Sequence, residues 1–385
     1  MPKPTVSLIA RAVVSGTILA AALPALSQTV PAPVAAARSW TVLDANTGKT
    51  LASQEAGLRI IPASLTKVMT AYLVFEAVRD ERLQWKQMVN VSLNAYRVDK
   101  SSSKMFIDPK VPVSIQDLTY GLIIQSGNDA AVQLAEEIAG SEETFAAMMN
   151  KKALELGMKG SHFMNASGLP HPEHYSTAED LAILAARLIR DFPEEYKIYS
   201  IKEFTYNNIK QGNRNLLLYR DPTVDGMKTG YVNGSGYNLI ASAKRNGDQR
   251  IITVVTGTAS ARVRADESMK LLGWAYSNFE SVKLAAAGQQ LATPTVWKGT
   301  QKSFKAGFGV DRFETLGKGA GSKIKTEMVV QEKLVAPIAK GAKVGTVKVS
   351  FDGKPLADLP LVALEDVKEA GFFARLWDSL MMLFA

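Results

Sequence analysis

The chain has 385 residues, a hydrophobic fraction of 46% and a formal net charge of +8. These values allow two globular domains with a well-buried core and exclude a polytopic membrane protein. The chain has no cysteine, which excludes disulfide frameworks and thiolate metal sites. Its basic residues are scattered without an RNA- or DNA-binding signature, so nucleic acid is not an expected partner.

The N-terminal end has the pattern of a secretory signal peptide. Lys3 and Arg11 precede an apolar run over 12–23, and small residues lead to a cleavage position before Gln28. The run is too short to span a membrane comfortably. We therefore expect export of the chain and removal of residues 1–27, with an uncleaved anchor as the alternative.

The first expected secondary structure follows a Pro/Ala linker over 29–38. Two strand-like runs within 39–53 flank the residues Asn46-Thr47-Gly48. Turn-forming residues between two such runs indicate a β-hairpin. The sequence therefore predicts a pair of strands at the beginning of the folded chain.

The next stretch, PASLTKVMTAYLVFEAV over 62–78, has the apolar spacing of a buried helix that begins near Pro62. It carries Lys67 three residues after Ser64, and residues at this spacing are neighbours on a helix. A serine hydroxyl becomes a good nucleophile when a base takes its proton. A lysine is such a base when burial lowers its pKa. The pair alone is a weak signal, because surface lysines at this spacing are common.

The stretch 114–140 predicts a helix, a short break and a second helix. Ser114 begins a capping box, and Gly140 is a plausible stop. The letters QSGND place Ser126 and Asn128 in the break, where we expect the polar groups to be exposed.

Two amphipathic helices are expected over 142–158 and 177–192. After them, DGMKTGY over 225–231 is expected on a strand that carries Lys228-Thr229-Gly230. The missing side chain of Gly230 would let a ligand approach the backbone closely.

The last part of this region predicts a hairpin and a closing helix. Strand-like runs over 237–243 and 250–257 flank a polar loop with an Asn-Gly pair, and a helical pattern follows over 261–279. The order of strands, helices, strands and helix predicts an α/β domain. Its mainly antiparallel sheet would join both ends of the domain.

The C-terminal part differs in texture. Residues 280–366 carry short β-rich runs with Gly and Pro between them and predict a small all-β domain. The tail over 367–385 has a helical period and is too short and too charged to span a bilayer, but it can lie in the membrane interface. Docking on the protein's own core is the alternative. The apolar residues on one face of the tail are Phe372, Phe373, Leu376, Leu380, Leu383 and Phe384.

Three short motifs occur in a defined order along the chain. S-x-x-K begins at Ser64, S-x-N begins at Ser126, and K-T-G begins at Lys228. The trio S-x-x-K, S-D-N and K-T-G is the signature of penicillin-binding proteins and class A β-lactamases. In this chain Gly127 replaces the aspartate of the middle motif.

The chain resembles the low-molecular-mass penicillin-binding proteins that are serine-type D-alanyl-D-alanine carboxypeptidases. The resemblance includes PASLTKVMTAY, QSGNDAA, NRNLLL, VDGMKTG, GYNLIASA and ADESMKLLGW. It implies a penicillin-binding/β-lactamase-like α+β domain over 28–279, with a mainly antiparallel sheet flanked by helices, followed by the small all-β domain and the amphipathic tail helix.

The same resemblance implies the function. Such proteins remove the terminal D-alanine from peptidoglycan stem pentapeptides and are acylated by β-lactams, and they need no cofactor. The expected location is the periplasmic face of the cytoplasmic membrane, with peripheral attachment to the membrane surface through the tail.

The resemblance also assigns roles to the motif residues. Ser64 would be the nucleophile, Lys67 its general base, and Ser126 the relay that gives a proton to the departing amine. The implied substrate-binding residues are Asn128 for the amide, Lys228 for the positive field, Thr229 and Arg214 for the terminal carboxylate, and Gly230 and Tyr231 beside them. Backbone N–H groups of Ser64 and Tyr231 would form the oxyanion hole. Arg214 has the alternative of being a surface arginine on a loop.

Two features depart from a simple assignment. Some relatives carry a histidine where this chain has Ser167, which leaves the part of the 165–169 loop in deacylation open. His162, His171 and His174 lie close together and raise the idea of zinc. Their spacing fits no short metal motif, so we expect a solvated loop and no metal.

Three other functions are weighed against the carboxypeptidase. A class A β-lactamase would carry a glutamate for deacylation, usually in an E-x-x-L-N loop, and this chain has no such string. A peptidoglycan D,D-endopeptidase of the same fold would generally lack the β domain and the tail. A non-catalytic wall-binding scaffold would not need the intact motif serines and lysines.

Overall fold

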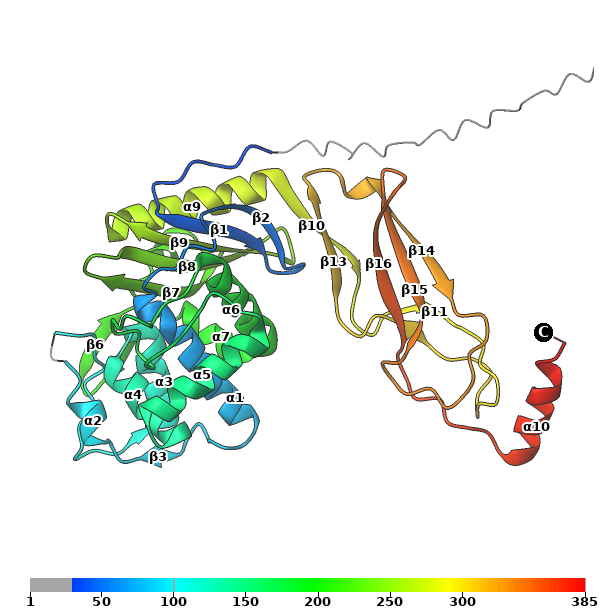
Figure 1. Ribbon diagram of the computed structural model, residues 1–385, viewed down its shortest axis with the longest axis horizontal. Helices are drawn as coiled ribbons and strands as arrows, with labels where there is room; N and C mark the ends of the chain where they lie inside the picture. The colour runs from blue at the N-terminus through cyan, green and yellow to red at the C-terminus, as the bar shows by residue number, and fades with distance from the viewer. Residues whose placement is uncertain (1–29, 100, 385) are drawn as a thin grey trace, which may run out of the picture. The chain divides into compact units, whose positions relative to one another are not determined.

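The computed structural model describes residues 30–99 and 101–384 (Figure 1). The predicted signal peptide lies outside the described residues. A central five-stranded sheet has the strand order β2-β1-β9-β8-β7, and its four neighbouring pairs are all antiparallel. Its strands are β1 (Ser39–Asp44), β2 (Lys49–Gln54), β7 (Val224–Val232), β8 (Gly236–Arg245) and β9 (Gln249–Thr258). Both predicted hairpins and the mainly antiparallel sheet are thereby confirmed.

Helices cover both faces of this sheet (Figure 1). Helix α9 (Ala261–Asn278) packs on one face, and α6 (Ala178–Asp191) packs on the other. Successive residues of β9 alternate between the two cores, since Ile251 belongs to the cluster with α9 and Ile252 to the cluster with α6. This alternation arises because successive residues of a strand point to opposite faces of the sheet.

The helical layer beside the sheet contains the first two motif segments. Helix α1 (Lys67–Arg79) follows a 3-10 turn at Ala63–Thr66. Helix α3 (Ile115–Tyr120) starts where the Ser114 hydroxyl accepts a hydrogen bond from the backbone N–H of Asp117 at 3.0 Å, which confirms the predicted cap.

The break predicted within 114–140 is present. A π-helical turn, Gly121–Gln125, ends at Ser126, whose backbone is left-handed with φ of 63°. Helix α4 (Asn128–Ala139) follows and stops at Gly140, which has φ of 77° and accommodates the left-handed C-cap. Helix α5 (Glu142–Leu156) continues the layer.

Short elements connect these parts. They are α2 (Leu93–Tyr96), α7 (Pro193–Tyr196), α8 (Leu217–Arg220), β3 (Met88–Val89), β4 (Val113–Ser114), β5 (Glu203–Tyr206) and β6 (Ile209–Gly212). The hairpin of β5 and β6 is not among the predicted elements.

The region after α9 is built from strands around a core of its own, as predicted. One sheet pairs β10 with β13, and the other has the order β11-β12-β16-β15-β14. The strands are β10 (Phe279–Ala285), β11 (Gln290–Ala292), β12 (Ala306–Gly307), β13 (Arg312–Gly317), β14 (Ile324–Val330), β15 (Lys343–Phe351) and β16 (Lys354–Ala363). Phe304, Phe308 and Leu361 are buried in the core of this region.

The tail contains helix α10 (Phe372–Met381), and its large apolar side chains are exposed to solvent. Phe373 is 83% exposed and Leu383 is 78% exposed. Arg375 forms an ion pair with Glu369 at 2.9 Å. Among the described residues, no helix has both the length and the apolar character that crossing a membrane requires.

Candidate active site

Ser64 and Lys67 lie in adjacent turns at the start of α1. Ser64 belongs to the 3-10 turn and Lys67 is the first residue of the α-helix. The Lys67 Nζ and Ser64 Oγ atoms are 3.0 Å apart, which confirms the contact expected for residues three apart. Lys67 is only 1% exposed. The amine and the hydroxyl can therefore exchange a proton directly.

Two further acceptors fix the Lys67 amine. The Asn128 side-chain oxygen and the Ser167 backbone carbonyl each accept a hydrogen bond from Nζ at 2.7 Å. A neutral amine has two N–H donors and one lone pair. If both donors are used on Asn128 and Ser167, the lone pair remains for the Ser64 hydroxyl. This geometry suits a base.

The electrostatic surroundings favour that neutral form. Burial, assisted by the positive charge of Arg214, lowers the pKa of Lys67 from 10.5 to about 7. The negative charges of Asp129 and Glu142 act in the opposite direction on the pKa of Lys67. Near neutral pH a large fraction of Lys67 is thus deprotonated.

The second motif serine pairs with the second motif lysine. Lys228 on β7 donates a hydrogen bond from Nζ to Ser126 Oγ at 2.8 Å. Both residues are buried, as is Asn128, so the expected exposure of the polar groups in this break is wrong. The left-handed backbone of Ser126 turns this segment into the protein and toward β7. Burial, then the charges of Lys67, Arg214 and Arg264, lower the pKa of Lys228 well below 10.5.

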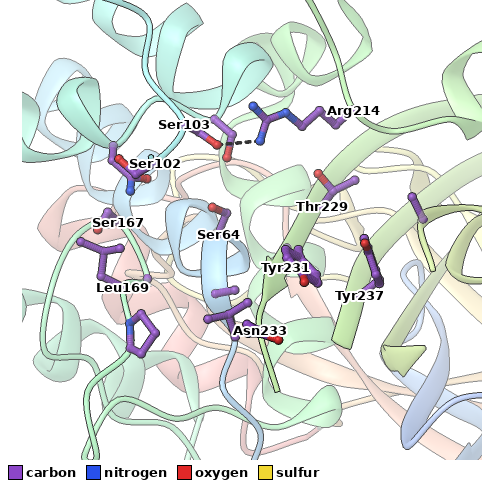
Figure 2. A pocket seen from close by; sticks show the side chains of 18 of the residues that line it. Ser64, Ser102, Ser103, Ser167, Leu169, Arg214, Thr229, Tyr231, Asn233 and Tyr237 are labelled. Atoms are coloured by element: carbon purple, nitrogen blue, oxygen red, sulfur yellow. Dashed lines mark hydrogen bonds between the residues drawn. The ribbon is translucent and has the colours of Figure 1, made fainter. Parts of the chain in front are cut away.

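A cleft of about 810 Å³ opens beside Ser64. Figure 2 shows Ser64 near its centre, with Ser167 and Leu169 on one side and Thr229 and Tyr231 on the other. The cleft is thus bounded by the 165–169 loop and by strand β7.

Arg214 lines the same cleft, which places it at the site and not elsewhere on the surface. Its Nη1 atom donates a hydrogen bond to Ser103 Oγ at 2.6 Å (Figure 2). Tyr231 packs against Tyr237 with ring centroids 4.3 Å apart. These residues form the polar and aromatic wall beside Thr229.

Gly230 lines the cleft and also has close neighbours within the protein. A Cβ at this position would lie 2.9 Å from the Pro62 carbonyl oxygen and 3.2 Å from Leu65 Cγ. The close neighbours belong to the protein's own turn before α1. Gly230 therefore allows β7 to pack against the segment that carries Ser64.

Two charged residues of this region were not predicted. Arg264 on α9 donates from Nη1 to the Gly230 carbonyl at 3.2 Å and from Nη2 to the Arg214 carbonyl at 3.4 Å. Burial lowers the pKa of Arg264 to about 10. Its position within an amphipathic helix gave no local signal, because the contact is with residues distant in sequence.

Asp129 is the second charged residue of this region that was not predicted. Its carboxylate accepts hydrogen bonds from the backbone N–H groups of Met105, Phe106 and Ile107 at 2.9, 2.8 and 3.3 Å. Asp129 directly follows Asn128, so it ties the S-x-N segment to the loop before α3. The position of Asp129 next to Asn128 in the string SGND is the sequence feature that could have identified it.

The three histidines lie in different environments. His174 is buried, and its Nε2 atom lies 2.9 Å from Thr66 Oγ1. The expectation of a solvated loop is therefore wrong for His174, and burial lowers its pKa to about 4. His162 and His171 lie in loops and contact Glu173 backbone groups. Within the described residues, no group of three or more metal-binding side chains is placed to hold an ion.

Known proteins share this fold and its sequence. The family model for D-alanyl-D-alanine carboxypeptidase matches residues 26–260, and the model for the C-terminal domain of penicillin-binding protein 5 matches residues 279–369. D-alanyl-D-alanine carboxypeptidase DacC of Escherichia coli is 43% identical over 366 residues, which cover 94% of this chain and 91% of that protein.

Solved structures of penicillin-binding proteins also match this chain. The crystal structure of penicillin-binding protein 5 from Haemophilus influenzae matches with a TM-score of 0.79 and 42% identity, covering 88% of this chain and 100% of the other. Penicillin-binding protein D2 from Listeria monocytogenes, in its cefotaxime-bound form, matches with a TM-score of 0.59 and 32% identity, covering 64% of this chain and 99% of the other.

The Asp129 contacts lead to a stability prediction. Replacing Asp129 with Ala leaves three backbone N–H groups without their acceptor, and we expect a loss of about 2–4 kcal/mol in the free energy of unfolding. Urea denaturation measures this loss. Asp99→Ala is the control, because Asp99 accepts a backbone N–H on an exposed turn and its removal should change little. Equal stabilities of the two variants would contradict a structural role for Asp129.

Proposed function

We propose that this chain, which belongs to the D-alanyl-D-alanine carboxypeptidase family, uses Ser64 as the nucleophile and Lys67 as the general base. The observation that carries this proposal is the 3.0 Å contact between Ser64 Oγ and a buried Lys67 amine whose other two partners are acceptors. The substrate of this serine D-Ala-D-Ala carboxypeptidase is the peptidoglycan stem peptide that ends in D-Ala-D-Ala.

The first half of the reaction forms an acyl-enzyme. Lys67 takes the proton of Ser64, and Ser64 Oγ attacks the carbonyl carbon of the penultimate D-alanine. The backbone N–H groups of Ser64 and Tyr231 receive the oxyanion, and one such donor typically contributes about 3–4 kcal/mol. Collapse of the tetrahedral intermediate breaks the peptide bond.

Ser126 delivers a proton to the leaving amine. Because Ser126 Oγ accepts a hydrogen bond from Lys228, its own hydroxyl hydrogen is free to be donated into the cleft. D-Alanine then leaves, and water hydrolyses the ester on Ser64. The Ser167 carbonyl keeps Lys67 in place through both halves.

The terminal carboxylate of the substrate is held by Arg214 and Thr229. Both line the cleft, and a guanidinium can bind a carboxylate through two parallel hydrogen bonds. Arg264 adds positive charge behind this wall, and Lys228 lies beside it with its amine hydrogen-bonded to Ser126. Asn128 lies at the Lys67 amine and can contact the substrate amide with its NH₂ group.

A β-lactam enters the first half of the same reaction and acylates Ser64. Its leaving group stays tethered after the ring opens, and this can block deacylation. The cefotaxime-bound form of the related Listeria protein supports this reaction for the shared fold.

The outer segments determine where the enzyme works. Residues 28–279 and 280–366 are two domains, which is supported by separate family matches to 26–260 and 279–369. Cleavage of residues 1–27 places the enzyme in the periplasm. The exposed apolar side chains of α10, together with the tail over 367–385, attach it to the membrane surface.

Removing the base tests the central assignment. For Lys67→Ala we expect acylation by a fluorescent penicillin, and release of D-alanine from a pentapeptide ending in D-Ala-D-Ala, to fall about 10²–10⁴-fold. Ser64→Ala should abolish both signals. Lys197→Ala, a surface change, is the control. Undiminished labelling of Lys67→Ala would refute its role.

The pKa of Lys67 sets the pH dependence. Because the base acts in its neutral form, the second-order rate of acylation should rise with pH and reach half of its maximum near pH 7. Stopped-flow measurement of acylation over a pH series gives this midpoint. A rate that falls as the pH rises through this range would contradict a neutral lysine base.

Deleting residues 368–385 tests the membrane attachment. The full chain without its signal peptide should sediment with phospholipid vesicles, because the α10 side chains bury apolar area in the interface. The shortened chain should stay in the supernatant and keep its rate of D-alanine release. Co-sedimentation of the shortened chain would count against the tail as the anchor.

A further inference from the structure

Glu142 begins helix α5 directly beside the active-site loop. Ser141 caps the helix, so the Glu142 carboxylate lies in the first turn, where the N-terminal end of a helix favours negative charge. The carboxylate is partly buried and faces inward, since its Oε1 atom accepts a hydrogen bond from the Ala166 backbone N–H at 3.0 Å. No role in the reaction derived above involves this group.

The loop that Glu142 contacts is the loop that touches the base. Ala166 is held on both sides, because its N–H is bound by Glu142 and its carbonyl accepts a hydrogen bond from Thr70 Oγ1 at 2.6 Å. The next carbonyl along the chain, that of Ser167, accepts from Lys67 Nζ at 2.7 Å. The carboxylate thus fixes the peptide group that leads directly to a Lys67 partner.

Glu142 also faces Lys67 electrostatically. The charged groups that act on the pKa of Lys67 are Arg214, which disfavours its ammonium form, and Asp129 and Glu142, which favour it. Lys67 in turn lowers the pKa of the neighbouring groups Lys228 and His174. Asp129 is already surrounded by three backbone N–H groups from residues 105–107. Glu142 receives one backbone N–H, and its own surroundings include the negative charge of Glu136.

We propose that Glu142 is a positioning residue for the general base. Its carboxylate holds the 165–169 loop in the arrangement that presents the Ser167 carbonyl to Lys67, and it places a negative charge near the base. This inference rests on the proposed role of Lys67 as the base. It assigns two separable contributions, a hydrogen bond and a charge, to one side chain.

Three variants separate these contributions. Glu142→Gln keeps an oxygen that can accept from Ala166 but removes the charge, whereas Glu142→Ala removes both. Glu143→Gln is the matched control, because Glu143 is the next residue of the same helical turn and is exposed to solvent. The measurement is the second-order rate of acylation by a fluorescent penicillin over a pH series, with thermal melting as a check that each variant is folded.

Removing the charge of Glu142 should lower the pH at which acylation is half-maximal, because the ammonium form of Lys67 loses a stabilising partner. For Glu142→Gln we expect a shift of roughly half a pH unit to one pH unit, with the maximal rate within about twofold of wild type. For Glu142→Ala we expect the same direction of shift and a maximal rate lower by about tenfold, because the loop loses its clamp. Glu143→Gln should coincide with wild type.

The outcomes distinguish this inference from the function on which it rests. One outcome overturns the role of Glu142 alone. In that outcome labelling still depends on Lys67, the midpoint is the same in wild type and Glu142→Gln, and the maximal rate of Glu142→Ala is unchanged. Labelling of Lys67→Ala at the wild-type rate overturns the role of Lys67 and this inference together. A purely structural role for Glu142 would lower the melting temperature without moving the midpoint, which also contradicts the proposal.

Discussion

The removal of one lysine amine from water is the constraint on which the site depends. Lys67 has a pKa of about 7 in place of 10.5, chiefly because it is buried. The change corresponds to a preference of roughly 5 kcal/mol for the neutral amine relative to a lysine in water. A buried amine must also be hydrogen-bonded. Ser64, Asn128 and Ser167 meet that need, and they come from three segments of the chain.

This requirement explains why the segments meet where they do. The turn that carries Ser64 packs against β7, and Gly230 leaves room for its backbone. The break before α4 is turned inward by the left-handed backbone of Ser126, so that Asn128 reaches Lys67 and Ser126 reaches Lys228. The sheet edge and the helical layer therefore act together as the frame for two buried amines.

Local patterns were sufficient to predict the elements that carry the motifs. The helical segment after Pro62, the cap at Ser114, the stop at Gly140 and the hairpins β1-β2 and β8-β9 each depend on residues close together in sequence. The contact of Ser64 with Lys67 could also be predicted, because helical geometry fixes it.

The remaining contacts join residues that are far apart in sequence, and no periodicity encodes them. The backbone contact of Ser167 with Lys67 spans 100 residues, and that of Arg264 with Gly230 spans 34. The burial of His174 against Thr66 spans 108 residues and reverses the solvated loop expected from composition. Such contacts depend on how the layers pack, which a single sequence shows only where a known family's motifs are present.

The arrangement of charge around the two amines bears on how substrate binding affects the base. Arg214 lines the cleft, and Lys67 and Lys228 are hydrogen-bonded to the cleft residues Ser64 and Ser126, so a substrate carboxylate is attracted to the cleft and reduces the repulsion among the three cations. That compensation alone would favour the ammonium form of Lys67 at the moment when a free base is needed. Burial is the largest cause of the lowered pKa, however, and Lys67 is already only 1% exposed without substrate. A base made neutral mainly by desolvation keeps its function when the substrate's negative charge arrives, whereas a base made neutral mainly by neighbouring cations would lose it.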